Sequence, residues 1–247
     1  MLMFICYLSA NVEVTKVNSF LTGIEFKIFY KSKFAMTNFI PIFPLGIVVF
    51  PGEDLNLHIF EPKYKQMITD CFAEAKPFGI PTVLKNGLSE KGTLAEVKEI
   101  VEVYEDGKLD IKTKGIAVFR ILEVVKEIPE KLYSGAIVNY PVNEEEQYIP
   151  LLRKVVKSIQ ELHEVLKLTK NFNKPEDELR SYDIAHHIGL SVEEEYELLG
   201  LLREDQRLEY LKRHLNKVLP VVSEMEVLKE RIKLNGHFKN LSGNFDM

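Results

Sequence analysis

The sequence is poor in cysteine, in basic charge and in long apolar runs, and each shortage excludes a class of protein. Among 247 residues only Cys6 and Cys71 are cysteines, so neither a disulfide framework nor a four-cysteine zinc site is available. The 32 Lys and Arg are outnumbered by 37 Asp and Glu, and the formal charge of −5 disfavours a polyanionic partner. With 46% hydrophobic and 28% charged residues the chain has a globular composition, for which we expect a cytoplasmic location and no membrane association.

Residues 1–35 differ from the rest of the sequence. They open on the apolar stretch MLMFICYLSA, which lacks the basic start of a secretory signal and is too short to span a membrane. Met36 stands directly before the first strongly patterned segment. We therefore expect residues 1–35 to be either a misannotated extension, with Met36 as the true start, or a poorly packed arm.

Between residues 36 and 142 short apolar runs alternate with turn residues, which predicts a β module. The run FIPIFPLGIVVF at 39–50 contains two prolines and a glycine, and such a pattern is typical of a bent strand in a curved sheet. Asp106-Gly107 predicts a hairpin turn, and Gly115 predicts a bulge. The further strands are expected at 55–60, 80–84, 94–104, 109–113, 116–125 and 133–140.

One helix is expected inside this β module. Pro62 favours a helix start, because proline is well tolerated at the first helical position. The spacing of the apolar residues predicts a buried stripe that contains Tyr64, Met67, Ile68, Cys71, Phe72 and Ala75. Cys71 lies on this stripe and is therefore interpreted as an inert core residue.

From residue 143 to 247 the apolar period becomes helical. We expect one helix over 148–166, a second that starts at Lys174-Pro175 and stops at Gly189, and a third that a capping box of Ser191 and Glu194 opens. A fourth helix should kink or end at Pro220, followed by a short helix over 225–234 and a fraying tail from Asn235. The fold class is therefore α+β, with a β module followed by a helical one.

The motifs that resemble catalytic or ligand sites do not meet their chemical requirements. Residues 87–93 read GLSEKGT, in which Thr93 occupies the place where a phosphate-binding loop needs lysine. The six histidines form no HExxH pair, and no G-x-S-x-G elbow is present, so neither a metal, a cofactor nor a catalytic residue is expected. Residues 183–191 have the outline of a helix-turn-helix, but the acidic stretch VEEEYE at 192–197 would repel phosphates, and no nucleic-acid partner is expected.

Several motifs resemble the N-terminal substrate-binding domain of Lon proteases. The opening signature consists of PIFPL at 41–45, VVFPG at 48–52 and LHIFEPKY at 57–64, and GIAVFRI at 115–121 is similar to a later strand of the family. Further similar segments are FGI at 78–80, GTLA at 92–95, the Asp106-Gly107 hairpin and the stretch 183–215. The resemblance covers about residues 39–220. It implies a curved, PUA-like β pseudobarrel at 36–142 with one inserted helix and a C-terminal helical bundle at 143–247, with 36–235 forming one unit.

The resemblance also implies a function. Lon proteases continue into ATPase and peptidase modules that this sequence lacks, so the chain resembles a free-standing, non-enzymatic member of the family. Such a domain is expected to recognise unfolded or degron-bearing polypeptides in protein turnover, as an adaptor or chaperone-like factor, with an ATP-dependent protease as a further partner. Two alternatives stay open: a hydrolase with an unrecognised site, and an RNA-binding barrel module.

The expected peptide site is a patch around the FPGE turn and the following strand. Its candidate residues are Phe50, Pro51, Leu57, His58 and Phe60. A peptide site should form a contiguous exposed apolar patch of several hundred Å². The alternative is that the apolar members build the core, and that Phe60-Glu61-Pro62 only fixes the corner between strand and helix.

Overall fold

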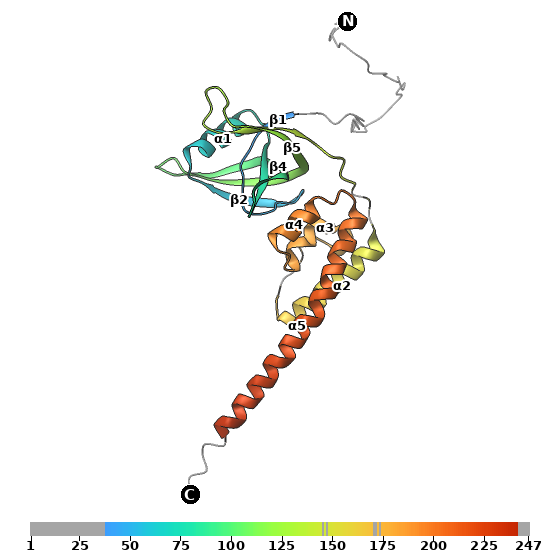
Figure 1. The fold of residues 1–247 in the computed structure, drawn as a ribbon. Coiled ribbons are helices and arrows are strands. Elements are labelled where there is room, and N and C mark those ends of the chain that lie inside the picture. Colours follow the sequence, from blue (N-terminus) through green and yellow to red (C-terminus); the bar gives the residue numbers. More distant parts are fainter. Residues whose placement is uncertain (1–37, 145, 147, 170–171, 173, 242–247) are drawn as a thin grey trace, which may run out of the picture. The chain divides into compact units, whose positions relative to one another are not determined.

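The computed structural model describes residues 38–144, 146, 148–169, 172 and 174–241 (Figure 1). Residues 1–35 and Met36 lie outside this described part, so the expectations about the N-terminal extension and the start remain predictions. The described strands all lie between residues 38 and 139, and the helices other than α1 lie between 149 and 241. This order confirms the α+β class.

Six strands form one antiparallel sheet. They are β1 (Asn38–Pro41), β2 (Asp54–Ile59), β3 (Phe78–Leu84), β4 (Gly87–Val103), β5 (Leu109–Val125) and β6 (Gly135–Asn139), and the main path runs β1-β6-β5-β4-β3. The segment after β1 returns to β3 in parallel, since the Phe43 N–H donates to Gly79 O at 2.8 Å and the Val83 N–H donates to Leu45 O at 2.7 Å. The sheet therefore curves round until its two ends meet, as the proline-rich run predicts.

The bulge expected at Gly115 is present, and the backbone requires glycine there. The register of β4 against β5 shifts where Ala95 pairs with Gly115 and Leu94 with Ala117. At the same point the Gly115 N–H donates to Glu53 O at 2.8 Å, and a Cβ on Gly115 would collide with the carbonyl oxygen of Phe50. The FPGE turn and β5 can therefore approach closely only because residue 115 has no side chain.

Helix α1 (Pro62–Ala73) begins at the expected proline and covers the interior of the β module. Met67, Ile68 and Cys71 are buried as expected. The predicted stripe is wrong at its end: Phe72 is 46% exposed, and Ala75 lies beyond the helix with a positive φ of 50°. The buried face is therefore narrower than the apolar spacing suggests, and the helix ends before Ala75.

The helical part starts with α2 (Ile149–Leu166), close to its expected bounds. The remaining elements are η1 (Glu176–Glu178), α3 (Ser181–Ile184), η2 (Ala185–His187), α4 (Val192–Leu199) and α5 (Glu204–Leu241). The single helix expected from Lys174 to Gly189 is therefore wrong, since the chain forms three short turns there. Leu179 interrupts them, with extended backbone and a side chain that is 1% exposed.

Helix α5 continues through Pro220 to Leu241, so the expected end at the proline is wrong. The fraying of the tail from Asn235 stays a prediction, and residues 242–247 lie outside the described part. A proline inside a helix removes the hydrogen bond to the carbonyl four residues earlier. Here Pro220 and Asn216 both lie on an exposed face, so water can satisfy the freed carbonyl. The predicted fourth helix and the short 225–234 helix are thus one element.

The two parts of the fold share a hydrophobic core. Val48, Phe50 and Val118 from the β part pack with α2, α3, α4 and α5 in one buried cluster. A second cluster fills the space between α1 and the sheet and contains Ile59, Met67 and Phe78.

Candidate functional site

Strand β2 is an edge strand of the otherwise curved and closed sheet. It pairs with residues 109–114 of β5, whose other side is paired with β4. No other described strand pairs with β2, so its second edge presents backbone N–H and C=O groups without a ladder partner. Such an edge is a template for another extended chain.

A hydrogen-bonded group of His58, Asp110 and Tyr104 lies beside this edge. The Nδ1 of His58 is 2.6 Å from Asp110 Oδ1, and the Tyr104 hydroxyl donates to Asp110 Oδ2 at 2.6 Å. The Tyr104 hydroxyl, and next the imidazole, lower the pKa of Asp110, while the bond to the carboxylate raises the pKa of Tyr104 to about 12. No described residue hydrogen-bonds His58 Nε2, so this nitrogen is available to a ligand.

Exposed apolar side chains surround this group. Phe60 is 60% exposed, with its ring 6.4 Å from the His58 ring, and Val103 near the end of β4 is 66% exposed. A register shift between Ile100 and Glu102 leaves Val101 unpaired and 51% exposed. The hollow between these strands has a volume of about 370 Å³, with a lining of Asn56, Leu57, His58, Val101, Asp110, Ile111 and Lys112.

The structure does not bring the five expected site residues into one patch. Leu57, His58 and Phe60 lie together at the β2 edge, where Leu57 is half-buried against the β core. Phe50 is fully buried and stacks on Tyr182 at 5.0 Å between ring centroids, so its side chain is packing in the shared core. Pro51 lies with Tyr182 at a separate hollow between the FPGE turn and α3. Of the five expected residues, Leu57, His58 and Phe60 at the β2 edge therefore remain candidates for a peptide site.

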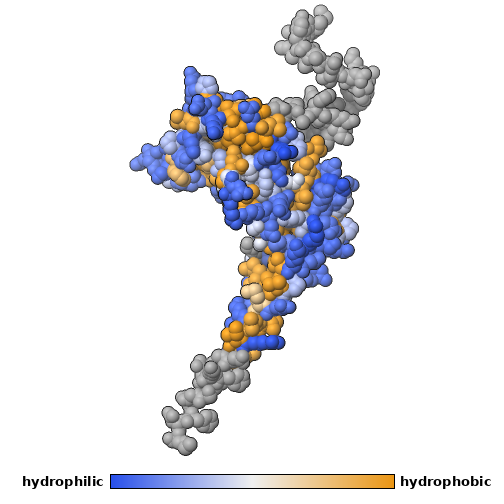
Figure 2. All heavy atoms as spheres, viewed as in Figure 1, coloured by the Kyte–Doolittle hydropathy of each residue, from blue (hydrophilic) through white to orange (hydrophobic). Residues whose placement is uncertain are grey.

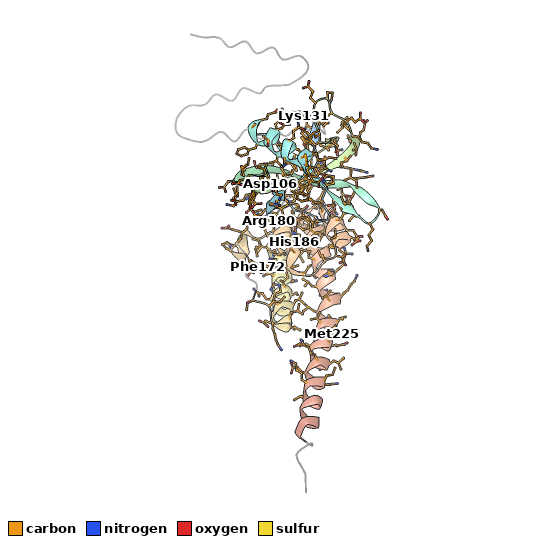
Figure 3. The ribbon with its side chains drawn as sticks, turned by 90° about the vertical axis from the view of Figure 1, so that its left-hand side faces the viewer. Asp106, Lys131, Phe172, Arg180, His186 and Met225 are labelled. Carbon is orange, nitrogen blue, oxygen red and sulfur yellow. The ribbon has the colours of Figure 1, made fainter. Side chains whose placement is uncertain are left out.

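The sequence reasoning missed two polar groups, of which the first links the β part to the helical part. His186 lies between Glu195 at 2.6 Å and Glu53 at 3.2 Å, and Figure 3 shows it where the helical part meets the β part. Burial lowers the pKa of His186, but the hydrogen bonds to Glu195 and Glu53 outweigh burial and raise it to about 10. Nothing in the local sequence around His186 and His187 predicts that His186 pairs with these two glutamates.

The second group is buried and links α3 to α5. Arg207 is 0% exposed, and its guanidinium donates to Glu204 at 2.8 Å and to the Ser181 hydroxyl at 2.8 Å. Glu204 also accepts from the Ser181 N–H and hydroxyl at 2.7 and 2.6 Å. The Asn143 side chain completes the group at 2.7 Å from Nη1 of Arg207. This group is structural, since all its charges are paired inside the protein.

The hydrolase alternative gains no catalytic site among the described residues. Cys71 is 4% exposed, which confirms it as a core residue, and burial raises the pKa of its thiol to about 11. The described residues contain no group of three or more His, Cys, Asp or Glu that could hold a metal ion. No described serine hydroxyl or cysteine thiol hydrogen-bonds His58, so the His58–Asp110 pair has no nucleophile to activate.

A comparison with known protein families shows to which family the chain belongs. The profile of the ATP-dependent protease La (LON) substrate-binding domain matches residues 40–217. The chain belongs to this family. The resemblance that rests on the motifs between residues 41 and 64 is thus confirmed, and what the chain shares with Lon proteases is the domain that lacks their catalytic modules.

The similar proteins include Lon proteases and Lon N-terminal domains. Lon protease 1 of Hydrogenovibrio crunogenus is 23% identical over 205 residues, and Lon protease of Geobacter metallireducens is 25% identical over 228 residues. These matches cover 76% and 83% of this chain, which spans about a quarter of either Lon protease (24% and 26%).

Two solved structures show the same Lon N-terminal fold. The Lon N-terminal domain protein of Xanthomonas campestris has a TM-score of 0.53 at 22% identity, and the match covers 71% of this chain and 98% of that one. The N-terminal domain of the Mycobacterium avium complex Lon protease also has a TM-score of 0.53, at 15% identity, over 72% of this chain and 98% of that one. Among the described residues, no helix of this Lon-type domain has the length and apolarity to cross a bilayer.

Proposed function

We propose that this Lon-type domain is a non-catalytic polypeptide-binding module that holds extended segments of unfolded or degron-bearing proteins along the β2 edge. The observation that carries the proposal is the unpaired edge of β2, together with the exposed side chains of His58 on this strand and of Phe60 directly after it. The cellular role would be that of an adaptor or chaperone-like factor, with an ATP-dependent protease as the downstream partner and the cytoplasm as its location.

Binding would rest on the two kinds of contact that an edge strand offers. The main chain of the polypeptide adds as a further strand, and its N–H and C=O groups pair with those of β2 irrespective of sequence. Alternate side chains of the polypeptide then meet the apolar surface of Phe60, while His58 Nε2 contacts a polar group. Because the main chain supplies much of the affinity, many different clients can bind.

The direct test is the binding of a fluorescent extended peptide with alternating apolar and polar residues, measured by fluorescence polarisation. Phe60→Ala and His58→Ala should each weaken binding, because they remove surface beside the edge. Phe72→Ala is the matched control: this phenylalanine is 46% exposed and lies about 15 Å along α1 from the helix start that follows Phe60, so its loss should leave binding unchanged.

A second peptide separates strand addition from simple apolar adhesion. N-methylation of alternate peptide nitrogens removes the N–H donors that pair with an edge and leaves the side chains intact. We expect one of the two methylation frames to abolish binding and the other to be tolerated, because alternate N–H groups of an added strand face β2. Equal binding of both methylated peptides, or an unchanged affinity of the Phe60 and His58 variants, would contradict this site.

A further inference from the structure

A polar hollow lies between the FPGE turn of the β part and α3 of the helical part. It has a volume of about 490 Å³, and its walls come from the FPGE turn, β4, β5, the segment 174–183 and the first turn of α5. Figure 2 shows apolar side chains gathered on the C-terminal half of α5 but mainly hydrophilic ones where the two parts of the fold meet, and Figure 3 places Arg180 at this junction. Neither His58 nor Phe60 lines the hollow, so it is separate from the proposed peptide site.

The walls of the hollow carry more positive than negative charge, although the whole chain has a formal charge of −5. Five cationic side chains line it against three carboxylates, which leaves a surplus of two positive charges. Four of the five cations lie in ion pairs, which are Lys98–Glu96, Lys114–Asp54, Lys174–Asp183 and Arg207–Glu204. The fifth cation is Arg180.

Arg180 is the cation of this hollow for which no described carboxylate serves as a partner. Its guanidinium donates one hydrogen bond, from Nη1 to the carbonyl oxygen of Leu179 at 3.1 Å. The other donors of this half-buried side chain meet no acceptor among the described residues. A guanidinium with free donors matches a carboxylate, because the planar group can donate two parallel hydrogen bonds to its two oxygens.

The charge balance favours a singly charged anion over a phosphate. A phosphate group carries nearly two negative charges and would require a second free cation. The other cations of the hollow are already paired, and Glu96, Asp183 and Glu204 in the same walls would repel the additional negative charge. A carboxylate, with its single charge, is therefore the anion that Arg180 can neutralise.

An apolar surface lies in the same hollow. Ile116 is 44% exposed and lines the hollow together with Pro51. It is unpaired in the register of β4 against β5, at the bulge beside Gly115. We propose that the hollow binds a carboxylate that lies next to an apolar side chain, which is the chemistry of the last residue of a polypeptide. The carboxylate contacts Arg180, and the side chain contacts Ile116 and Pro51.

The need for a carboxylate is tested on the native protein. The probe is a heptapeptide of glycine and serine that ends in leucine and carries a fluorophore at its N-terminus, so it lacks the alternating apolar residues expected at the β2 edge. Replacement of its C-terminal carboxylate by an amide should weaken binding about tenfold or more in fluorescence polarisation, because a charge-assisted contact is lost. Equal affinities of the acid and the amide overturn the proposal.

A competition experiment distinguishes the two sources of such a carboxylate. Unlabelled acid peptide and N-acetyl-leucine are each added to the labelled acid peptide. Equal competition by both shows that a small carboxylic acid is a sufficient ligand. Stronger competition by the peptide shows that the hollow takes the end of a polypeptide chain. In either case the amide peptide should compete about tenfold more weakly than the acid peptide.

Arginine variants test whether the carboxylate binds in this hollow. Arg180→Gln should weaken the acid peptide about tenfold and leave the amide peptide unchanged. Arg153→Gln is the matched control, since it removes the same charge from an exposed position on α2 that does not line the hollow, and it should change neither affinity. Arg180→Lys keeps the charge but loses the paired hydrogen bonds, so its affinity should be intermediate.

The ratio of the acid and amide affinities separates this site from the β2 edge. Phe60→Ala should leave the ratio unchanged, because the β2 edge does not require a free carboxylate. Urea unfolding shows whether each variant is folded, and Arg180→Lys together with the native protein suffices if Arg180→Gln is not. A ratio that folded Arg180 variants leave at the native value overturns the site, whatever the result for Phe60.

Discussion

Two hydrogen-bonded charge groups of this domain use the same chemistry in opposite surroundings. Glu204, Arg207 and Ser181 are almost completely buried between α3 and α5. His58, Asp110 and Tyr104 form an equally short chain of contacts at the β2 edge, where the His58 side chain is 51% exposed. The hydrogen bonds are alike, so burial is what separates a group that stabilises the fold from one that a ligand can reach.

The difference follows from solvation. A buried carboxylate must keep its partner, because water cannot replace a lost contact inside the core. At the surface, water solvates either partner that is left alone, so the same kind of pair adds little to folding. The β2 edge can therefore carry polar groups for binding at little structural cost, whereas the α3–α5 contact cannot be altered freely.

The largest loss of stability is expected from the removal of the Arg207 side chain. Arg207→Ala leaves Glu204 as an unpaired buried charge and should lower the free energy of unfolding by about 5 kcal/mol, at the upper end for broken buried pairs. Arg203→Ala is the matched control, since Arg203 pairs with Asp205 at a side-chain exposure of 52% and should cost less than about 1 kcal/mol. Urea unfolding measures both, and equal losses would contradict the contrast between the buried and the exposed pair.

The next largest loss of stability is expected for Phe50→Ala, and the comparison with Phe60→Ala distinguishes a core residue from a surface residue. Phe50→Ala removes a fully buried ring stacked on Tyr182 and should lower the free energy of unfolding by about 3–4 kcal/mol. Phe60→Ala, at a ring that is 60% exposed, should cost less than about 1 kcal/mol and yet weaken peptide binding. The same urea experiment compares them, and a stable Phe50→Ala with lost binding would return Phe50 to the peptide site.

These two phenylalanines also show where the sequence informs and where it does not. Local rules correctly place the start of α1 at Pro62, the Asp106-Gly107 hairpin and the capping box, in which Glu194 N–H donates to the Ser191 hydroxyl at 3.2 Å. These features depend on neighbours within a few residues. The burial of Phe50 depends on α3, more than a hundred residues later, and an apolar residue after a strand looks the same whether a helix covers it or not.

The same reason explains the missed polar groups. An i, i+3 pair such as Glu204 and Arg207 is the usual pattern of an exposed helix face, and only the position of Ser181 against α5 buries it. Pro220 misleads in the other direction: proline disfavours a helix interior, but here the carbonyl that it frees lies on an exposed face and the helix continues. Long-range packing decides the first case, and solvent exposure decides the second.

A smaller effect on the free energy of unfolding is expected from His186, whose burial is between that of Arg207 and that of His58. Its pKa is raised to about 10 by Glu195 and Glu53, against an unfolded value of about 6.5. The stabilisation is therefore complete below pH 6.5 and is lost as the pH rises through 10. Since the side chain is 40% exposed, solvent screening limits it to about 1 kcal/mol. The advantage of the native protein over His186→Gln in urea unfolding should shrink between pH 6.5 and 10, and a constant difference would mean that the imidazole is neutral.

The smallest effect on stability is expected for the exposed group of His58, Asp110 and Tyr104. The Tyr104 hydroxyl, followed by His58, lowers the pKa of Asp110, so the carboxylate should titrate below its ordinary range of about 3.9. Tyr104→Phe removes the larger cause and should raise the midpoint, which an NMR titration of the Asp110 carboxyl carbon measures. Because the group is solvated, the same variant should leave the urea midpoint at pH 7 unchanged. A clear loss of stability would show that this group, like Glu204 and Arg207, is part of what holds the fold together.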